Sequence, residues 1–151
     1  MFYPNDPRSR GWRVEGRLHK LFKGVVKHEL LRQDYTVYME PRAPPVKRLE
    51  WGPYRPDVLG IASDHAVFKV ALAECETAPN RTRVQAKTAT IQQTLTLQKQ
   101  LHERHVIRPL LIIPPRKLNR INSSVIRRFW EIWIVSRRGT LAHKIPRTAK
   151  T

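Results

Sequence analysis

The run from Val67 to Ala73 is apolar at every position except Lys69, and it leads directly into the acidic cluster Glu74-Cys75-Glu76. A strand without polar alternation is typical of a sheet that is covered on both faces. A second apolar run, Val58 to Ile61, precedes it across the turn Ser63-Asp64-His65, so the two runs predict a β-hairpin. We therefore expect a layered protein with a covered sheet.

Patterns on either side of the hairpin complete an α/β order. Apolar residues at three- and four-residue steps predict helices over residues 12–32, 82–102 and 118–129. β-Branched, aromatic and apolar residues predict strands over residues 35–40, 106–113 and 131–135. The fold class expected from this order is α/β, with a mixed central sheet flanked by helices.

The remaining segments define the domain boundaries. Residues 41–56 contain five prolines among basic residues, so a long basic loop is expected there. Residues 1–11 are expected to form a polar N-terminal arm and residues 137–151 a basic C-terminal tail. The prediction is a single domain over residues 12–136, which is long enough to bury a substantial core.

Charge narrows the choice of partner. The chain has 29 Lys and Arg against 12 Asp and Glu, a formal net charge of +17 in 151 residues. Such a field attracts polyanions at long range, so nucleic acid is the first partner expected. Six of the acids nonetheless lie between residues 40 and 76, which leaves an acidic region within a basic protein.

The expected location is the cytoplasm, without a membrane partner. The first residues, Met1 to Asp6, lack the layout of a secretory signal, and Cys75 is a single cysteine that cannot form an internal disulfide. The longest apolar stretch, Leu110 to Ile113, is far too short to span a bilayer.

The acidic region has a spacing that suits a metal ion. Residues i and i+2 of a strand point to one face, so Glu74 and Glu76 project together while Cys75 faces away. The hairpin brings Asp57 beside Glu74. Two unit charges about 4 Å apart interact by roughly 4 kcal/mol at an effective dielectric near 20, so these carboxylates need a cation or a raised pKa. Oxygen ligands favour Mg²⁺ or Mn²⁺. The simpler interpretation is that Asp57 starts a turn, and that Glu74 and Glu76 face water or pair with a nearby arginine.

At this point the residues resemble the PD-(D/E)xK nuclease superfamily. The resemblance covers residues 12–114 and implies a restriction-endonuclease-like fold with core order αβββαβ. It implies Asp57 and Glu74 as metal ligands and Glu15 as an accessory catalytic acid, with Glu40 near the site. For Glu15, a charge that complements the helix dipole is the alternative.

The chain departs from the pattern at one position. Glu76 stands where the superfamily has a lysine that activates the attacking water. Glu76 is then a third ligand or a water-orienting group. The resemblance also implies a substitute lysine from the next helix, Lys87, while Lys69 is a weaker candidate because its side chain faces away from Glu74.

Three functions follow from these residues. The first is a Mg²⁺- or Mn²⁺-dependent DNA endonuclease, for which a homodimer is one expected assembly because two strands must be cut. The second is a catalytically inactive DNA-binding module of the same fold, and the third is a basic RNA-binding protein. His19 and His28 have no partner at zinc-like spacing, so neither is expected to be a metal ligand.

A set of basic side chains is expected to contact DNA phosphates, and two aromatic residues of the basic loop are expected to stack on bases. The basic residues are Arg42, Lys47, Arg48, Arg55, Arg81, Arg83, Arg116 and Lys117, and the aromatic residues are Trp51 and Tyr54.

Overall fold

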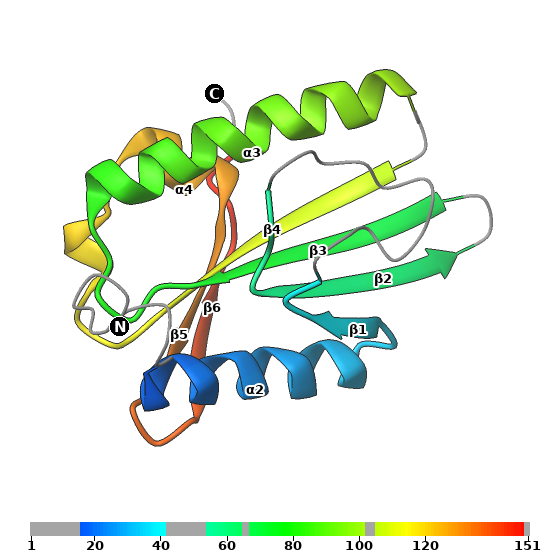
Figure 1. Ribbon diagram of the computed structural model, residues 1–151. Helices are drawn as coiled ribbons and strands as arrows, with labels where there is room; N and C mark the ends of the chain where they lie inside the picture. Colours follow the sequence, from blue (N-terminus) through cyan, green and yellow to red (C-terminus); the bar gives the residue numbers. More distant parts are fainter. Residues whose placement is uncertain (1–15, 42–53, 65–66, 102–104, 150–151) are drawn as a thin grey trace, which may run out of the picture.

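The computed structural model describes residues 16–41, 54–64, 67–101 and 105–149, and Figure 1 labels its elements. The helices are α2 (Arg17–Arg32), α3 (Arg81–Leu101) and α4 (Ser124–Phe129), with the short 3-10 helix η1 (Leu118–Arg120). The strands are β1 (Thr36–Met39), β2 (Val58–Asp64), β3 (Val67–Cys75), β4 (His105–Ile113), β5 (Glu131–Val135) and β6 (Leu141–Ile145). Within the described ranges, none of the helices combines the length and apolarity needed to cross a membrane.

The strands form one mixed sheet in the order β1-β2-β3-β4-β5-β6. The first three strands are antiparallel neighbours, β3 to β5 are parallel, and β6 is antiparallel to β5. Parallel neighbours require a crossover, which α3 supplies between β3 and β4, and η1 with α4 between β4 and β5. The order α2-β1-β2-β3-α3-β4 confirms the predicted core order.

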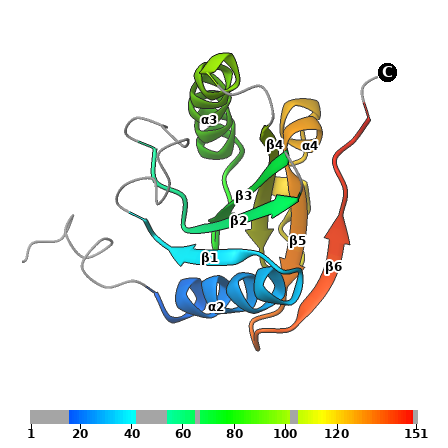
Figure 2. The same cartoon turned by 90° about the vertical axis from the view of Figure 1, so that its right-hand side faces the viewer.

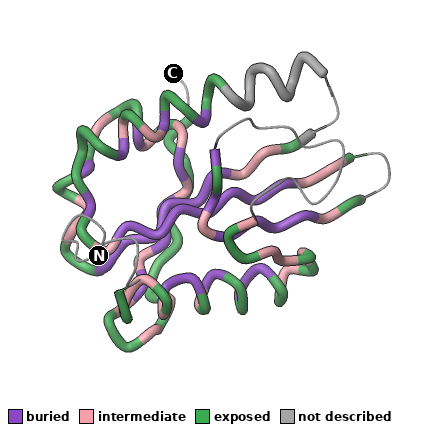
Figure 3. Tube along the Cα trace, in the orientation of Figure 1, coloured by how far each residue is buried: buried purple, intermediate pink, exposed green. Residues whose placement is uncertain are grey.

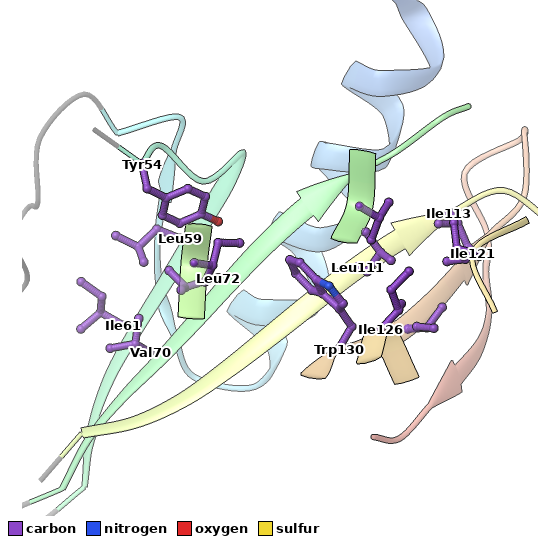
Figure 4. Close-up of a cluster of buried hydrophobic side chains, with 13 residues drawn as sticks. Tyr54, Leu59, Ile61, Val70, Leu72, Leu111, Ile113, Ile121, Ile126 and Trp130 are labelled. Atoms are coloured by element: carbon purple, nitrogen blue, oxygen red, sulfur yellow. The ribbon is translucent and has the colours of Figure 1, made fainter. Parts of the chain in front are cut away.

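Helices cover both faces of the sheet, with α2 on one side and α3 and α4 on the other (Figures 1 and 2). Strand residues alternate between two cores: Ala71, Ala73 and Cys75 pack with α2, whereas Val70 and Leu72 pack with α3 and α4. Figure 3 shows the resulting buried stretch along the middle of the sheet, and Figure 4 shows part of the core beneath α3 and α4. The apolar run is therefore covered on both faces from Val70 to Ala73, as predicted, whereas Val67 at its start is exposed.

The helix predicted over residues 118–129 is two elements, η1 and α4. The break has a local cause, because Ser123 adopts an extended conformation and its hydroxyl accepts the N–H of Ile126 at 3.2 Å. A serine that caps in this way begins a new helix. The hairpin also differs from the expectation, since β2 continues through the predicted turn as far as Asp64.

The sheet continues into the segment predicted to be a basic tail. Strand β6 pairs with β5 beyond the domain boundary expected at residue 136. The turn between them contains Gly139 at φ 88°, a conformation that favours glycine, and an added Cβ there would lie 2.9 Å from Leu21 Cδ1. The strand is exposed at its three central positions, so its residues lack the apolar pattern that sequence inspection detects.

Polar side-chain contacts connect β6 to α2. Glu29 is buried on α2 and accepts hydrogen bonds from Arg32 at 3.0 and 2.8 Å, from Gln33 at 3.0 Å and from the Lys144 ammonium of β6. The Arg32 guanidinium, followed by Lys144 and Gln33, overcomes the effect of burial and lowers the pKa of Glu29 to about 2. The carboxylate therefore contributes to stability through these donors.

This contribution depends on pH in a predictable direction. The folded-state pKa of Glu29 lies below its ordinary value of 4.5, so the contribution is present above about pH 4.5 and is lost as pH falls through about 2. Glu29→Gln is expected to be less stable than wild type at pH 6 by a margin that shrinks toward pH 2. Urea unfolding across this range measures it, with exposed Asp34→Asn as the control. A margin equal at pH 6 and pH 2 would contradict this role.

Candidate active site

The predicted acids meet where β2 begins and β3 ends. Val58 pairs with Ala73, so the residues just outside this pair, Asp57 and Glu74, are neighbours across the two strands. The backbone N–H of Asp57 donates to the Ala73 carbonyl at 3.0 Å, and the N–H of Cys75 donates to Asp57 Oδ2 at 2.8 Å. Main-chain geometry therefore holds the Asp57 carboxylate against the end of β3.

Lys87 reaches the acids from α3. Its ammonium donates to Glu74 Oε1 and to Glu76 Oε2, both at 2.8 Å. Lys87 lies on the helix one turn from Val84 and Ile91, which are both fully buried against the sheet. Glu74 and Glu76 both project toward this helix, since each accepts a hydrogen bond from Lys87, and Glu76 follows directly after β3. The structure thus brings together Asp57, Glu74, Glu76 and Lys87.

Burial and the surrounding charges both change the pKa values of Glu74 and Lys87. Burial, followed by the neighbouring charge of Asp57, raises the pKa of Glu74 to about 7 even though Lys87 and Tyr54 lower it. Burial alone would lower the pKa of Lys87, but the carboxylates of Glu74 and Glu76 outweigh it and raise that pKa. The site therefore keeps its lysine charged and holds Glu74 close to its protonation point at neutral pH.

Asp57 has a partner that the sequence does not reveal. Burial favours its protonated form, but hydrogen bonds from His19 and from the Cys75 N–H outweigh burial and lower the pKa of Asp57. His19 Nε2 lies 3.3 Å from Asp57 Oδ2. The histidine comes from the first turns of α2, so only the packing of this helix on the sheet makes it a site residue. His28, in contrast, is exposed further along α2.

Tyr54 was predicted to stack on a base, and this prediction is wrong. The side chain is only 8% exposed and belongs to the core beneath α3 (Figure 4). Its hydroxyl donates to Glu74 Oε2 at 2.7 Å. Burial and the Glu74 charge raise the pKa of Tyr54 well above its usual value. Tyr54 is therefore a neutral donor that orients the Glu74 carboxylate.

Removing this donor should be visible in the titration of Glu74. The Tyr54 hydroxyl lowers the pKa of Glu74, so Tyr54→Phe is expected to move it upward from about 7. Carbon-detected NMR of the side-chain carboxyl groups measures the shift, with the exposed carboxyl group of Asp34 as the internal reference. A pKa of Glu74 that stays the same or falls in Tyr54→Phe would contradict the orienting role.

Glu76 and Glu40 have cationic partners of their own. Arg83 Nη2 lies 3.2 Å from Glu76 Oε1 and donates to the Ala78 carbonyl at 2.7 Å, so this predicted DNA contact neutralises Glu76. The Glu40 carboxylate accepts from Lys23 at 2.7 Å, while its backbone N–H donates to the Asp57 carbonyl at 2.9 Å. Glu40 thus lies next to Asp57 through its main chain.

The donor set suits a cation held by two carboxylates. Among the residues that the structure describes, no group of three His, Cys, Asp or Glu side chains has the arrangement of a metal site. Mg²⁺, however, typically takes one or two carboxylates and completes its shell with water and substrate phosphate. Asp57 and Glu74 lie close enough for the charge of one to raise the pKa of the other, which fits such a pair.

The other predicted site residues have different positions. Arg55, Arg81 and Arg116 are exposed and Lys117 is half-buried, whereas Lys69 pairs with Ala62 and Val106 toward the opposite end of β3. Several predicted residues lie outside the described ranges, namely Glu15, Arg42, Lys47, Arg48 and Trp51.

Comparison with protein-family models and with curated proteins finds no match. Among solved structures, the chain is similar to an XisH family protein from Nostoc punctiforme PCC 73102, with 12% identity, a TM-score of 0.50 and coverage of 83% of this chain and 98% of that one. An fdxN element excision controlling factor protein from Anabaena variabilis matches with 13% identity, a TM-score of 0.47 and the same coverages. At such identity the likeness concerns the fold alone, and together with the strand order it identifies the chain's fold as restriction-endonuclease-like.

Proposed function

We propose that the protein is a Mg²⁺- or Mn²⁺-dependent DNA endonuclease. One observation carries the proposal: the Lys87 ammonium lies 2.8 Å from Glu74, although Glu76 occupies the usual position of the lysine on the strand. A lysine donated by the next helix supplies the same charge at the same acid. The net charge of +17 supports a polyanionic substrate.

In this proposal Asp57 and Glu74 hold the ion. A bound divalent ion polarises a phosphodiester and lowers the pKa of a coordinated water. His19 and the Cys75 N–H fix the orientation of Asp57, and Tyr54 fixes that of Glu74. Because such donors restrict both carboxylates, the ligands need little rearrangement to hold a cation.

Lys87 has a separate part in the reaction. Its ammonium, kept charged by Glu74 and Glu76, offsets the negative charge that develops on the phosphate in the transition state. Glu76 orients this ammonium from the strand position where the superfamily lysine stands. Arg83 balances the second oxygen of Glu76, so that the extra acid does not repel the substrate.

Cleavage of plasmid and branched DNA tests the proposal. We expect nicking with Mg²⁺ or Mn²⁺, none in EDTA, and none from Asp57→Asn because the variant loses a ligand charge. Asp34→Asn is a matched control, since Asp34 is exposed at φ 67°, a conformation that asparagine tolerates. Equal cleavage by wild type and Asp57→Asn would exclude this site as the catalytic centre.

A second candidate is a DNA-binding module without activity. It is favoured by the fact that both oxygens of Glu74 already accept hydrogen bonds, one from Tyr54 and one from Lys87. This candidate predicts salt-sensitive binding that needs no divalent ion, with no cleavage under any metal. Competition between duplex DNA and duplex RNA of one sequence separates both candidates from an RNA-binding protein.

A further inference from the structure

A pocket outside the carboxylate site lies between the start of α3 and η1. Its volume is about 440 Å³, and it is lined by Pro79, Asn80, Arg81, Thr82, Asn119 and Arg120. Five of these six residues carry a hydrogen-bonding side chain, two of those side chains are guanidinium groups, and none is acidic. The pocket therefore has the composition of an anion site rather than of an apolar ligand site.

The two guanidinium groups differ from three other arginines of the described chain, which have carboxylate counter-ions. Arg32 pairs with Glu29, Arg83 with Glu76 and Arg108 with Glu131. Within the described part of the chain, neither Arg81 nor Arg120 has a carboxylate at ion-pair distance.

Like charges facing one cavity repel each other unless an anion lies between them. Arginine is also the side chain best suited to phosphate oxygens, because its planar donors can bind two of them at once.

The neighbouring polar groups are consistent with the same ligand. Asn80 Oδ1 accepts the backbone N–H of Arg83 at 3.1 Å, which leaves its amide nitrogen as a donor. The first turn of α3 contains no acidic residue that would compete for the guanidinium groups. Asparagine and threonine side chains commonly contact phosphates in nucleic-acid complexes.

The sheet topology puts this pocket at the same edge as the carboxylates. β3 and β4 are parallel and end together, with Cys75 paired to Ile112, so the segments that follow them leave from one edge. One segment leads from Glu76 to Arg81, and the other leads to Arg120. The start of α3 also lies beside α4 (Figure 1).

We propose that this pocket binds a backbone phosphate of duplex DNA, held jointly by Arg81 and Arg120, next to the phosphodiester that is cut. The inference rests on the proposed function for its choice of DNA. A second anchored phosphate fixes the strand relative to Asp57 and Glu74, and it does so through the backbone, without reading bases.

Fluorescence anisotropy of a labelled duplex tests the pocket, with the full chain in EDTA and KCl varied. Arg81→Gln and Arg120→Gln are each expected to weaken binding by about tenfold, as for loss of a hydrogen bond to a charged group. Because both arginines hold one phosphate, the double variant should weaken binding less than the product of the two effects. For the double variant, the slope of the logarithm of the binding constant against the logarithm of the KCl concentration should fall in magnitude by about one. This is the value expected for the loss of one phosphate contact.

Lys27→Gln is the control, since Lys27 is exposed on α2 across the sheet and its replacement removes the same charge. If Lys27→Gln weakens DNA binding as much as the arginine variants do, the proposed pocket is overturned. A salt slope that falls by about two in the double arginine variant would also overturn it, because the two arginines would then contact two separate phosphates. A melting-temperature increase with inorganic phosphate that both arginines require, without any effect on DNA binding, would also overturn it. If the arginine variants lose more affinity for duplex RNA than for duplex DNA, the pocket is a site for RNA and the proposal is wrong.

The outcomes separate this inference from the proposed activity. If the arginine variants bind DNA normally while Asp57→Asn loses cleavage, the pocket fails and the endonuclease stands. If no metal supports cleavage but the arginine variants lose DNA binding, the pocket stands and catalysis fails.

Discussion

Lys87→Met is expected to lower DNA cleavage by about 100- to 1000-fold, the usual loss when one donor that stabilises transition-state charge is removed. The reason lies in the site itself, because Lys87 is the cation that contacts both Glu74 and Glu76, each at 2.8 Å. DNA binding should change little, since the exposed arginines Arg81, Arg83 and Arg120 remain. Plasmid nicking rates and anisotropy, measured on the same preparations, give the two quantities.

A relocated lysine provides the matched control. In the double variant Glu76→Lys with Lys87→Gln, the ammonium returns to the strand position that the superfamily uses, and Arg83 loses its carboxylate partner. We expect this variant to recover much of the cleavage lost in Lys87→Met. Urea unfolding of both variants checks the fold, because Glu74 is only 3% exposed and loses its cationic partner in Lys87→Met. Full activity in Lys87→Met would exclude Lys87 from the reaction.

Trp130→Ala is expected to destabilise the protein by about 3–5 kcal/mol, the usual cost of truncating a buried aromatic side chain. Trp130 is 0% exposed and belongs to the core beneath α3 and α4 (Figure 4). Its Nε1 donates to Thr88 Oγ1 at 2.8 Å, and the Thr88 hydroxyl donates to the Val84 carbonyl at 2.7 Å. The indole thus links α4 to the helix that carries Lys87, so cleavage should also fall at temperatures where the variant is partly unfolded.

Two comparisons separate packing from hydrogen bonding at this position. Trp130→Phe keeps most of the apolar volume and loses the bond to Thr88, for which a cost of about 1 kcal/mol is typical. Val125→Ala changes an exposed residue of α4, the helix that ends just before Trp130; Val125 is 49% accessible, and its truncation should alter stability by no more than about 0.5 kcal/mol. A loss below 1 kcal/mol in Trp130→Ala would show that this core repacks around the cavity.

Local sequence patterns were sufficient to predict the helices and strands that form the centre of the fold. The run from Val70 to Ala73 is apolar because α2 and α3 cover opposite faces of β3, and this requirement is visible in the residues themselves. The resemblance suggested a lysine from the next helix, and Lys87 lies on its inward face, one turn from the buried Val84 and Ile91. Strand β6 was not, because its central residues are exposed and its pairing rests on main-chain hydrogen bonds to β5.

The sequence by itself determined the α/β order and the acidic pair across the hairpin, because each follows from helical or strand periodicity over a few residues. The candidate lysine came from the resemblance to the superfamily. Only the tertiary structure decided which groups complete the site. His19 contacts Asp57 from 38 residues away, and Tyr54 contacts Glu74 from 20 residues away. No periodicity relates such residues, since their contact depends on how α2 and the chain before β2 pack against the end of the sheet.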